Sequence, residues 1–281
     1  MAMPADLWLV RHGQSEANII IHAAMNGDTS YYEGGRMEAA DSVWRLTSKG
    51  VRQAKTIGSF INEIQPHFDR YIVSPYVRTL ETAANMKLNG ALWEKDRTVR
   101  ERSWGEINAV PQDSIRDRYE LNLLFKQIDP LYWRPSSGES IAELAEIRVH
   151  NMLTRLKEKS TSNDSVIVVS HGEFMSACRL VIEEIDDDRY LEMLRNKKYE
   201  VQNCQAMHYT RRDPNTGRLA ERFGWLQLHR IVENEDGSMS VRTHSWKEFG
   251  RETYTNDELE EYVNNVPHRL TDDPDVPFPG M

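Results

Sequence analysis

The sequence is poor in cysteine, and its two cysteines, Cys178 and Cys204, stand far apart. Small secreted domains that depend on disulfides carry many cysteines in a short chain, so a disulfide framework is excluded. Isolated cysteines behave as small buried hydrophobic residues. We therefore expect both thiols in the core, and a reducing compartment, the cytoplasm, as the location.

Long hydrophobic runs and long basic stretches are also missing. No apolar run approaches the roughly 20 residues that a transmembrane helix needs, and the first residues lack the charged start and apolar core of a signal peptide. The formal net charge is −9, which disfavours nucleic acid as a partner. We expect neither a membrane nor a nucleic acid to be bound.

Metal-binding spacings are equally scarce. The nine histidines form no His-x-x-x-His pair, and there is no Cys-x-x-Cys. Those two spacings are typical of zinc sites. We expect no metal site and no cofactor.

The sequence does contain short apolar runs that alternate with amphipathic helical patterns. This alternation is typical of an α/β protein with a mainly parallel sheet covered on both faces. The apolar runs predict buried strands at 7–10, 71–73 and 166–169. Helical spacing predicts helices at 48–64, 78–88 and 140–156, and further extended segments are expected at 207–210, 226–232 and 239–244.

We predict one three-layer domain over residues 1–250, with helices flanking the central sheet. Residues 19–45 mix glycines with aromatic residues and are expected to form a partly irregular insertion. Residues 251–281 are acidic and end in Pro274, Pro277 and Pro279, so we predict a loosely attached tail.

Reactive side chains follow the predicted strands, at the point where each strand ends. Arg11 and His12 follow the first strand, Arg78 lies just beyond the second, and His171 follows 166–169. Glu101 follows an expected extended stretch near Val99. Because ligands bind at the carboxyl ends of strands in open α/β sheets, we expect these residues to meet on one rim.

This set of residue types suits phosphoryl transfer. Arginine is permanently charged, and its planar guanidinium matches phosphate oxygens. A histidine with a pKa near neutrality can be a nucleophile or a proton donor, and a glutamic acid can protonate a leaving oxygen. Phosphoryl transfer requires positioning, charge neutralisation and that proton.

The same residues resemble the signature of the histidine phosphatase superfamily, also called the phosphoglycerate mutase-like family. The first motif is Leu-Val-Arg-His-Gly-Gln-Ser-Glu-Ala-Asn at 9–18, and Gly138-Glu139-Ser140 matches a motif frequent among its phosphatases. Four more stretches agree in the family's order, at 46–54, 74–83, 101–105 and 168–172. The resemblance spans about residues 7–210 and implies a phosphoglycerate mutase-like fold.

The resemblance implies a role for each residue of this set. His12 would attack phosphorus and become a phosphohistidine, while Arg11, Arg78 and His171 would bind the phosphoryl oxygens. Glu101 would protonate the leaving oxygen and then activate water. Because arginines also stand at positions 100 and 102, the alignment of Arg78 and Glu101 with the family's motifs stays open.

Four further residues are candidates for substrate binding. Asn18 would hydrogen bond to the phosphoryl group, or else to the start of a helix. Gly13 and Gly172 would let backbone approach the anion closely. Arg134 precedes Glu139 by five positions, as a substrate-contacting arginine does in the fructose-2,6-bisphosphatase branch, although an exposed arginine is the alternative.

We therefore predict a metal-independent phosphomonoester hydrolase of unassigned substrate and oligomeric state. Its substrate would be a small phosphorylated molecule or a phosphoprotein. The mutase branch usually carries an Arg-Arg pair where Trp133-Arg134-Pro135 offers one arginine, which disfavours a phosphoglycerate mutase-type phosphotransferase. A non-catalytic protein that binds a phospho-ligand or partner is the third interpretation.

Overall fold

The computed structural model describes residues 2–28, 30–32, 40–106, 120–250 and 253–267. The chain divides into two compact units, Met1–Gly250 and Arg251–Met281. The second unit contains helix α10 (Asn256–Asn264), which begins with a capping box between Thr255 and Glu258. The last part of the predicted tail and residues 33–39 of the predicted insertion lie outside the described residues.

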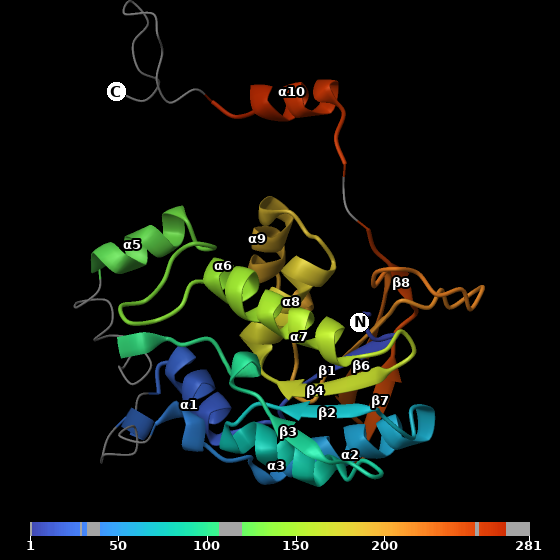
Figure 1. The fold of residues 1–281 in the computed structure, drawn as a ribbon. Coiled ribbons are helices and arrows are strands. Elements are labelled where there is room, and N and C mark those ends of the chain that lie inside the picture. The colour runs from blue at the N-terminus through green and yellow to red at the C-terminus, as the bar shows by residue number, and fades with distance from the viewer. Residues whose placement is uncertain (1, 29, 33–39, 107–119, 251–252, 268–281) are drawn as a thin grey trace, which may run out of the picture. The chain divides into compact units, whose positions relative to one another are not determined.

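Eight strands of the described chain form one mixed sheet in the first unit (Figure 1). Its order is β3-β2-β4-β1-β5-β6-β7, and β8 pairs with β6. The neighbours from β3 to β1 are parallel, and those from β1 onward are antiparallel. The strands are β1 (Asp6–Arg11), β2 (Arg70–Val73), β3 (Trp93–Lys95), β4 (Ser165–Ser170), β5 (Ala206–Thr210), β6 (Trp225–Glu233), β7 (Met239–Thr243) and β8 (Lys247–Glu248).

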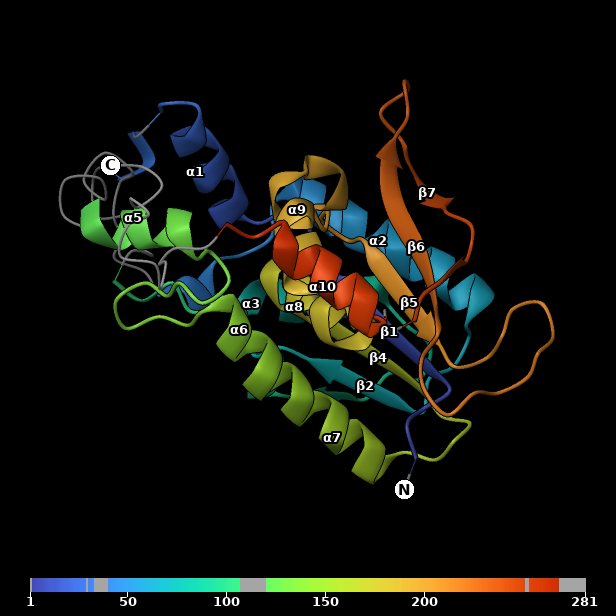
Figure 2. The same ribbon diagram turned by 90° about the horizontal axis from the view of Figure 1, so that it is seen from above.

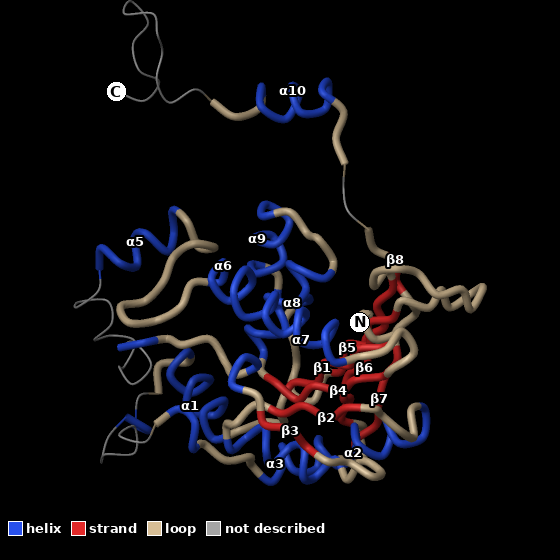
Figure 3. Tube along the Cα trace, viewed as in Figure 1, coloured by secondary structure: helices blue, strands red, loops and turns tan. Residues whose placement is uncertain are grey.

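Helices cover both faces of the sheet, so the three-layer α/β prediction is confirmed (Figures 1 and 3). The described α-helices of the first unit are α1 (Glu16–Met25), α2 (Ser48–Ile64), α3 (Val77–Met86), α5 (Glu120–Ile128), α6 (Ile141–Glu143), α7 (His150–Lys159), α8 (Gly172–Ile182) and α9 (Asp187–Arg195). A π-helical segment, η6 (Leu144–Val149), joins α6 to α7 in one continuous run (Figure 2).

The core follows directly from the alternation of side chains along each strand. In β4, Val166 and Val168 pack on the face covered by η6, α7 and α8, whereas Ile167 and Val169 pack on the face covered by α2 and α3. β1 alternates in the same way. Strands buried on both faces therefore read as unbroken apolar runs, and this is why 7–10 and 166–169 were predictable.

The structure corrects the expected extended stretch near Val99. Residues Arg97–Val99 form a 3₁₀ helix, η4, and the strand of this region is β3, which ends at Lys95. Asp96 decides this locally, because its carboxylate accepts hydrogen bonds from the Thr98 backbone N–H at 2.8 Å and hydroxyl at 2.7 Å. A side chain that satisfies nearby backbone donors competes with strand pairing.

The predicted insertion contains some regular structure where the structure describes it. α1 continues to Met25, and two short 3₁₀ helices follow, η1 (Ser30–Tyr32) and η3 (Asp41–Val43). Among the described residues, none of the helices combines the length and hydrophobicity that crossing a bilayer requires.

Candidate active site

Two histidines meet at the carboxyl ends of neighbouring parallel strands. His12 follows β1 and His171 follows β4, and the register pairs Arg11 with Ser170. Their ring centroids lie 5.2 Å apart at an interplanar angle of 65°. The two side chains are 2% and 0% exposed. The close packing of strands β1 and β4 thus places both imidazoles at one buried point on the rim.

The hydrogen bond of His12 determines which of its nitrogens is free. Nδ1 lies 2.7 Å from the carbonyl oxygen of Gly13. A carbonyl oxygen can only accept, so Nδ1 donates the proton and Nε2 keeps its lone pair. Burial, Arg11 and Arg78 lower the pKa of His12 well below its usual value. The imidazole is therefore neutral near pH 7, as a nitrogen nucleophile must be.

Arg11 and Arg78 supply the positive charge beside the histidines. Arg78 is 4% exposed and donates to Asp41, from Nη1 to the carbonyl oxygen at 2.7 Å and to Oδ1 at 3.2 Å, and from Nη2 to Oδ2 at 3.2 Å. Arg11 donates from Nη1 to the carbonyl oxygen of Val201. Its buried Nε has no hydrogen-bond partner within the described residues. Arg11 therefore keeps a donor for a ligand.

His171 is held by residues at the end of the next strand, β2. Its Nε2 lies 2.7 Å from the hydroxyl oxygen of Ser74, and its ring packs edge-on against Tyr76 with centroids 5.0 Å apart. Its buried Nδ1 has no partner among the described atoms. Burial and Arg78 are the main causes that lower its pKa well below the usual value. An anion near the two histidines would oppose that shift and favour a proton on the imidazole.

Glu101 lies beside the arginines with its carboxylate against the start of α8. Oε1 accepts hydrogen bonds from the backbone N–H groups of Arg102 at 3.0 Å and Phe174 at 3.3 Å. Burial and the neighbouring carboxylate of Glu173 raise the pKa of Glu101 to about 7, although Arg78 opposes the shift. Glu101 can therefore hold or release a proton near neutral pH, as a general acid and base must.

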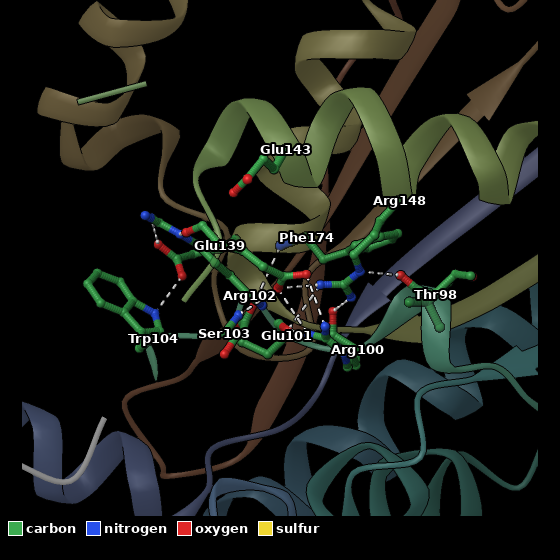
Figure 4. Close-up of polar contacts among 12 residues, drawn as sticks. Thr98, Arg100, Glu101, Arg102, Ser103, Trp104, Glu139, Glu143, Arg148 and Phe174 are labelled. Carbon is green, nitrogen blue, oxygen red and sulfur yellow. Dashed lines mark hydrogen bonds and ion pairs between the residues drawn. The ribbon is translucent and has the colours of Figure 1, made fainter. Parts of the chain in front are cut away.

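The segment that carries Glu101 is fixed by Glu139 (Figure 4). The Glu139 carboxylate accepts two hydrogen bonds from Arg100 at 2.9 and 3.0 Å, one from Arg148 at 2.9 Å and one from the Ser103 N–H at 2.8 Å. Arg148 in turn donates to the carbonyl oxygen of Glu101 at 3.3 Å. Sequence reasoning missed this network, because its members are spread over positions 100–148 and meet only in the fold.

Asn18 and Gly13 have structural partners in this arrangement. The Asn18 Oδ1 accepts from the Ser15 N–H at 3.1 Å and from Asn203 Nδ2 at 3.1 Å, so the helix-start alternative is present. A Cβ atom at Gly13 would stand 2.5 Å from the carbonyl oxygen of Gly50. Glycine at position 13 therefore lets β1 and α2 approach each other.

Gly172 and Arg134 differ sharply in where they lie. A Cβ atom at Gly172 would stand 3.2 Å from Nε of Arg11, so glycine leaves room for the guanidinium. The Arg134 side chain is 65% exposed and pairs with Glu143 at 3.1 Å. It lines a hollow with Phe125 and Tyr132, and is not among the residues that line the cavity beside Glu101.

Other contributors were missed at the sequence level. Ser74 follows β2 inside the quoted stretch 74–83, so its position at a strand end was a usable signal. Asn203 donates from Nδ2 to the carbonyl oxygen of His12 at 3.1 Å, and no local pattern marks it. Within the described residues no group of histidine, cysteine, aspartate and glutamate could hold a metal ion.

Comparison with known proteins agrees with this geometry. The profile of the histidine phosphatase superfamily (branch 1) matches residues 7–212. A 2,3-bisphosphoglycerate-dependent phosphoglycerate mutase of Rhizobium etli is 25% identical over 185 residues, which cover 64% of this chain and 81% of the mutase.

Two solved phosphatases share the fold. The alpha-ribazole phosphatase of Shigella flexneri superposes with a TM-score of 0.57 at 17% identity, covering 88% of this chain and 100% of its own. A mycobacterial glucosyl-3-phosphoglycerate phosphatase in complex with VO3 also gives 0.57 at 17% identity, covering 86% and 98%. The chain belongs to the histidine phosphatase superfamily and has its phosphoglycerate mutase-like fold.

Proposed function

We propose that this protein is a metal-independent phosphomonoester hydrolase that works through a phosphohistidine at Nε2 of His12. The observation that carries the proposal is the state of His12. Its Nδ1 proton is engaged by the Gly13 carbonyl oxygen, and its pKa is lowered well below the usual value. A neutral imidazole with a free Nε2 beside two arginines suits attack on an anionic phosphoryl group.

The reaction would proceed in two balanced steps. First, Nε2 of His12 bonds to phosphorus while the phosphorus–oxygen ester bond breaks, and the leaving oxygen takes the proton of Glu101. Second, the Glu101 carboxylate takes a proton from water as the water oxygen bonds to phosphorus. The phosphorus–nitrogen bond then breaks, and phosphate is released with Glu101 protonated again.

The remaining rim residues would hold the phosphoryl oxygens. Arg11 and His171 each have a buried nitrogen without a partner in the described chain, and Arg78 adds a second guanidinium. These groups would stabilise the charge that spreads over the phosphoryl oxygens in the transition state. We infer a small phosphorylated substrate, with a phosphoprotein as the other source of the same group. Two buried free thiols support a cytoplasmic location.

A mutase activity is the second candidate, and the Rhizobium etli relative favours it. A mutase must hold a second acidic end of its substrate. Where the mutase branch carries its arginine pair, this chain has the one arginine Arg134, which is exposed and paired with Glu143. This arrangement supports hydrolysis over mutase chemistry.

The test is hydrolysis of p-nitrophenyl phosphate by wild type and His12→Ala in EDTA across a pH series. We expect metal-independent hydrolysis by the wild type and a loss of about 10⁴-fold or more in the variant. An acid-labile, alkali-stable phosphoenzyme should form only in the wild type. If well-folded wild type gives no hydrolysis and no phosphoenzyme, the proposal fails. Phosphate exchange between phosphoglycerates would then point to a mutase.

A further inference from the structure

A cavity of about 270 Å³ opens beside the proposed site, on the side where Glu101 lies. Arg11, Glu101 and Gly172 line it from the rim, and residues of α9 and of the 3₁₀ helix η7 (Lys197–Tyr199) line it from the other side. A leaving group protonated by Glu101 must occupy the space next to Glu101. The cavity is therefore the natural place for the alcohol part of a substrate.

A second carboxylate, Glu173, lines the same cavity directly beside Glu101. It is the second residue of α8, and its neighbour Phe174 donates its backbone N–H to Glu101. Arg102 links the two acids as well. Its backbone N–H donates to Glu101 at 3.0 Å, and its guanidinium Nη1 donates to Glu173 at 3.3 Å.

The surroundings assign the negative charge to Glu173 and the proton to Glu101. Glu173 accepts from Trp104 Nε1 at 2.8 Å and from Arg102, and both contacts favour its charged form. Burial raises the pKa of both acids, and Glu173 adds to the increase at Glu101. The other charged groups that act on Glu101 and Glu173 are Arg11, Arg78, Arg102, Lys126 and Arg148.

Arg102 pairs with Glu173 at 3.3 Å, but it is not among the residues that line the cavity, so the Glu173 carboxylate is the member of that pair that faces the cavity. Lys197 and Glu200 also line it, and they have opposite signs. Arg11 faces the phosphoryl position. Glu173 is the carboxylate that acts on Glu101, so its negative charge lies next to the leaving oxygen.

We propose that Glu173 selects against leaving groups that carry a carboxylate, so that the substrates are phosphomonoesters of uncharged alcohols or amino alcohols. This inference rests on the proposed hydrolase function. A carboxylate brought beside Glu173 would meet a like charge in a partly buried space, and such contacts reject a ligand strongly. An ammonium or hydroxyl group would be accepted there.

The test uses two substrate pairs that differ in one carboxylate. These are glycerol 3-phosphate against 3-phosphoglycerate, and phosphoethanolamine against phosphoserine. We expect wild type to prefer the member without the carboxylate by about tenfold or more in kcat/KM. Glu173→Gln should reduce each preference to about threefold or less by improving kcat/KM for the carboxylate-bearing member.

Two further measurements separate this role from a structural one. Glu200→Gln removes the same charge from the same cavity, and it should leave both preferences near the wild-type values. Glu173→Gln should also move the alkaline decline of kcat/KM to lower pH, because Glu101 then loses its proton more easily.

The inference is overturned if wild type hydrolyses the carboxylate-bearing members equally well, an outcome that needs no variant. It is also overturned if folded Glu173→Gln keeps the wild-type preferences, or if Glu200→Gln changes them as much. Failure of the hydrolase proposal looks different, because wild type would then fail to hydrolyse p-nitrophenyl phosphate as well.

Discussion

The ion pair at the end of α8 and the histidine–arginine cluster at the rim differ in how completely their polar groups are hydrogen bonded. Arg179 and Glu183 are 6% and 4% exposed and share two hydrogen bonds, at 2.7 and 3.0 Å. The hydroxyl of Tyr209 donates a third to Glu183 at 2.9 Å. The charges of this pair are compensated within the protein.

In the rim cluster (Arg11, His12, Arg78, Glu101 and His171), the two histidines and Arg78 are buried to a similar degree and Arg11 and Glu101 are half-buried, but the cluster is left incomplete. Arg11 Nε and His171 Nδ1 have no hydrogen-bond partner in the described part of the chain. Burying a polar group without a partner costs free energy, so proteins rarely tolerate it without a reason. Buried charge alone therefore does not mark a site. Buried nitrogens without a partner beside a nucleophile do mark one.

The largest effect is expected from a substitution that breaks the compensated Arg179–Glu183 pair. Arg179→Met leaves the Glu183 carboxylate buried without its counter-charge, and should lower the free energy of unfolding by about 3–5 kcal/mol. Urea unfolding would measure the loss. The double variant Arg179→Met/Glu183→Gln removes both charges and keeps an acceptor for Tyr209, so it should recover more than half of the loss. Equal stability of the single and double variants would contradict this account.

The next effect concerns the acid of the rim cluster. Glu101→Gln cannot supply a proton, so kcat/KM on an alkyl phosphate should fall by about 10²–10³-fold. The loss should be smaller on p-nitrophenyl phosphate, because nitrophenolate leaves without a proton. Wild-type activity should decline above about pH 7, where Glu101 loses its proton. A variant that keeps this alkaline decline would show that another group titrates.

A smaller effect tests the network that holds Glu101. Glu139→Gln weakens the contacts with Arg100 and Arg148 and lets the Glu101 segment shift, so kcat should fall by about tenfold while the fold persists. Steady-state kinetics with a far-ultraviolet circular dichroism control would measure it. An unchanged kcat would mean that Arg148, through its bonds to the carbonyl oxygens of Thr98 and Glu101, positions the segment alone.

The smallest effect tests Arg78, which forms an ion pair with Asp41. Asp41 occupies Nη1 and Nη2 of Arg78, and a bound oxyanion must compete with it. Asp41→Asn should therefore tighten inhibition by orthovanadate by about threefold. Glu81→Gln, which breaks the nearby pair with Arg45, is the matched control and should leave inhibition unchanged. Weaker inhibition in Asp41→Asn would mean that Asp41 orients Arg78 for the ligand.

Much of the sheet was predictable because its central strands are buried on both faces. The runs at 7–10 and 166–169 correspond to β1 and β4, and the helical spacing at 48–64 corresponds to α2. The error near Val99 arose because a polar side chain, Asp96, bonds the backbone locally and has no hydrophobic signature. The capping box of Ser15 and Asn18 starts a helix that extends into the predicted insertion as far as Met25.

The sequence by itself determined which residues follow the strands and that their types suit phosphoryl transfer, because these facts depend on local order along the chain. Only the tertiary structure decided what each residue touches. It placed Asp41 on Arg78, Gly50 against Gly13 and Glu173 beside Glu101. Each of these contacts joins segments at least 30 residues apart. Their geometry depends on how helices pack on the sheet, and no local pattern of residues encodes it.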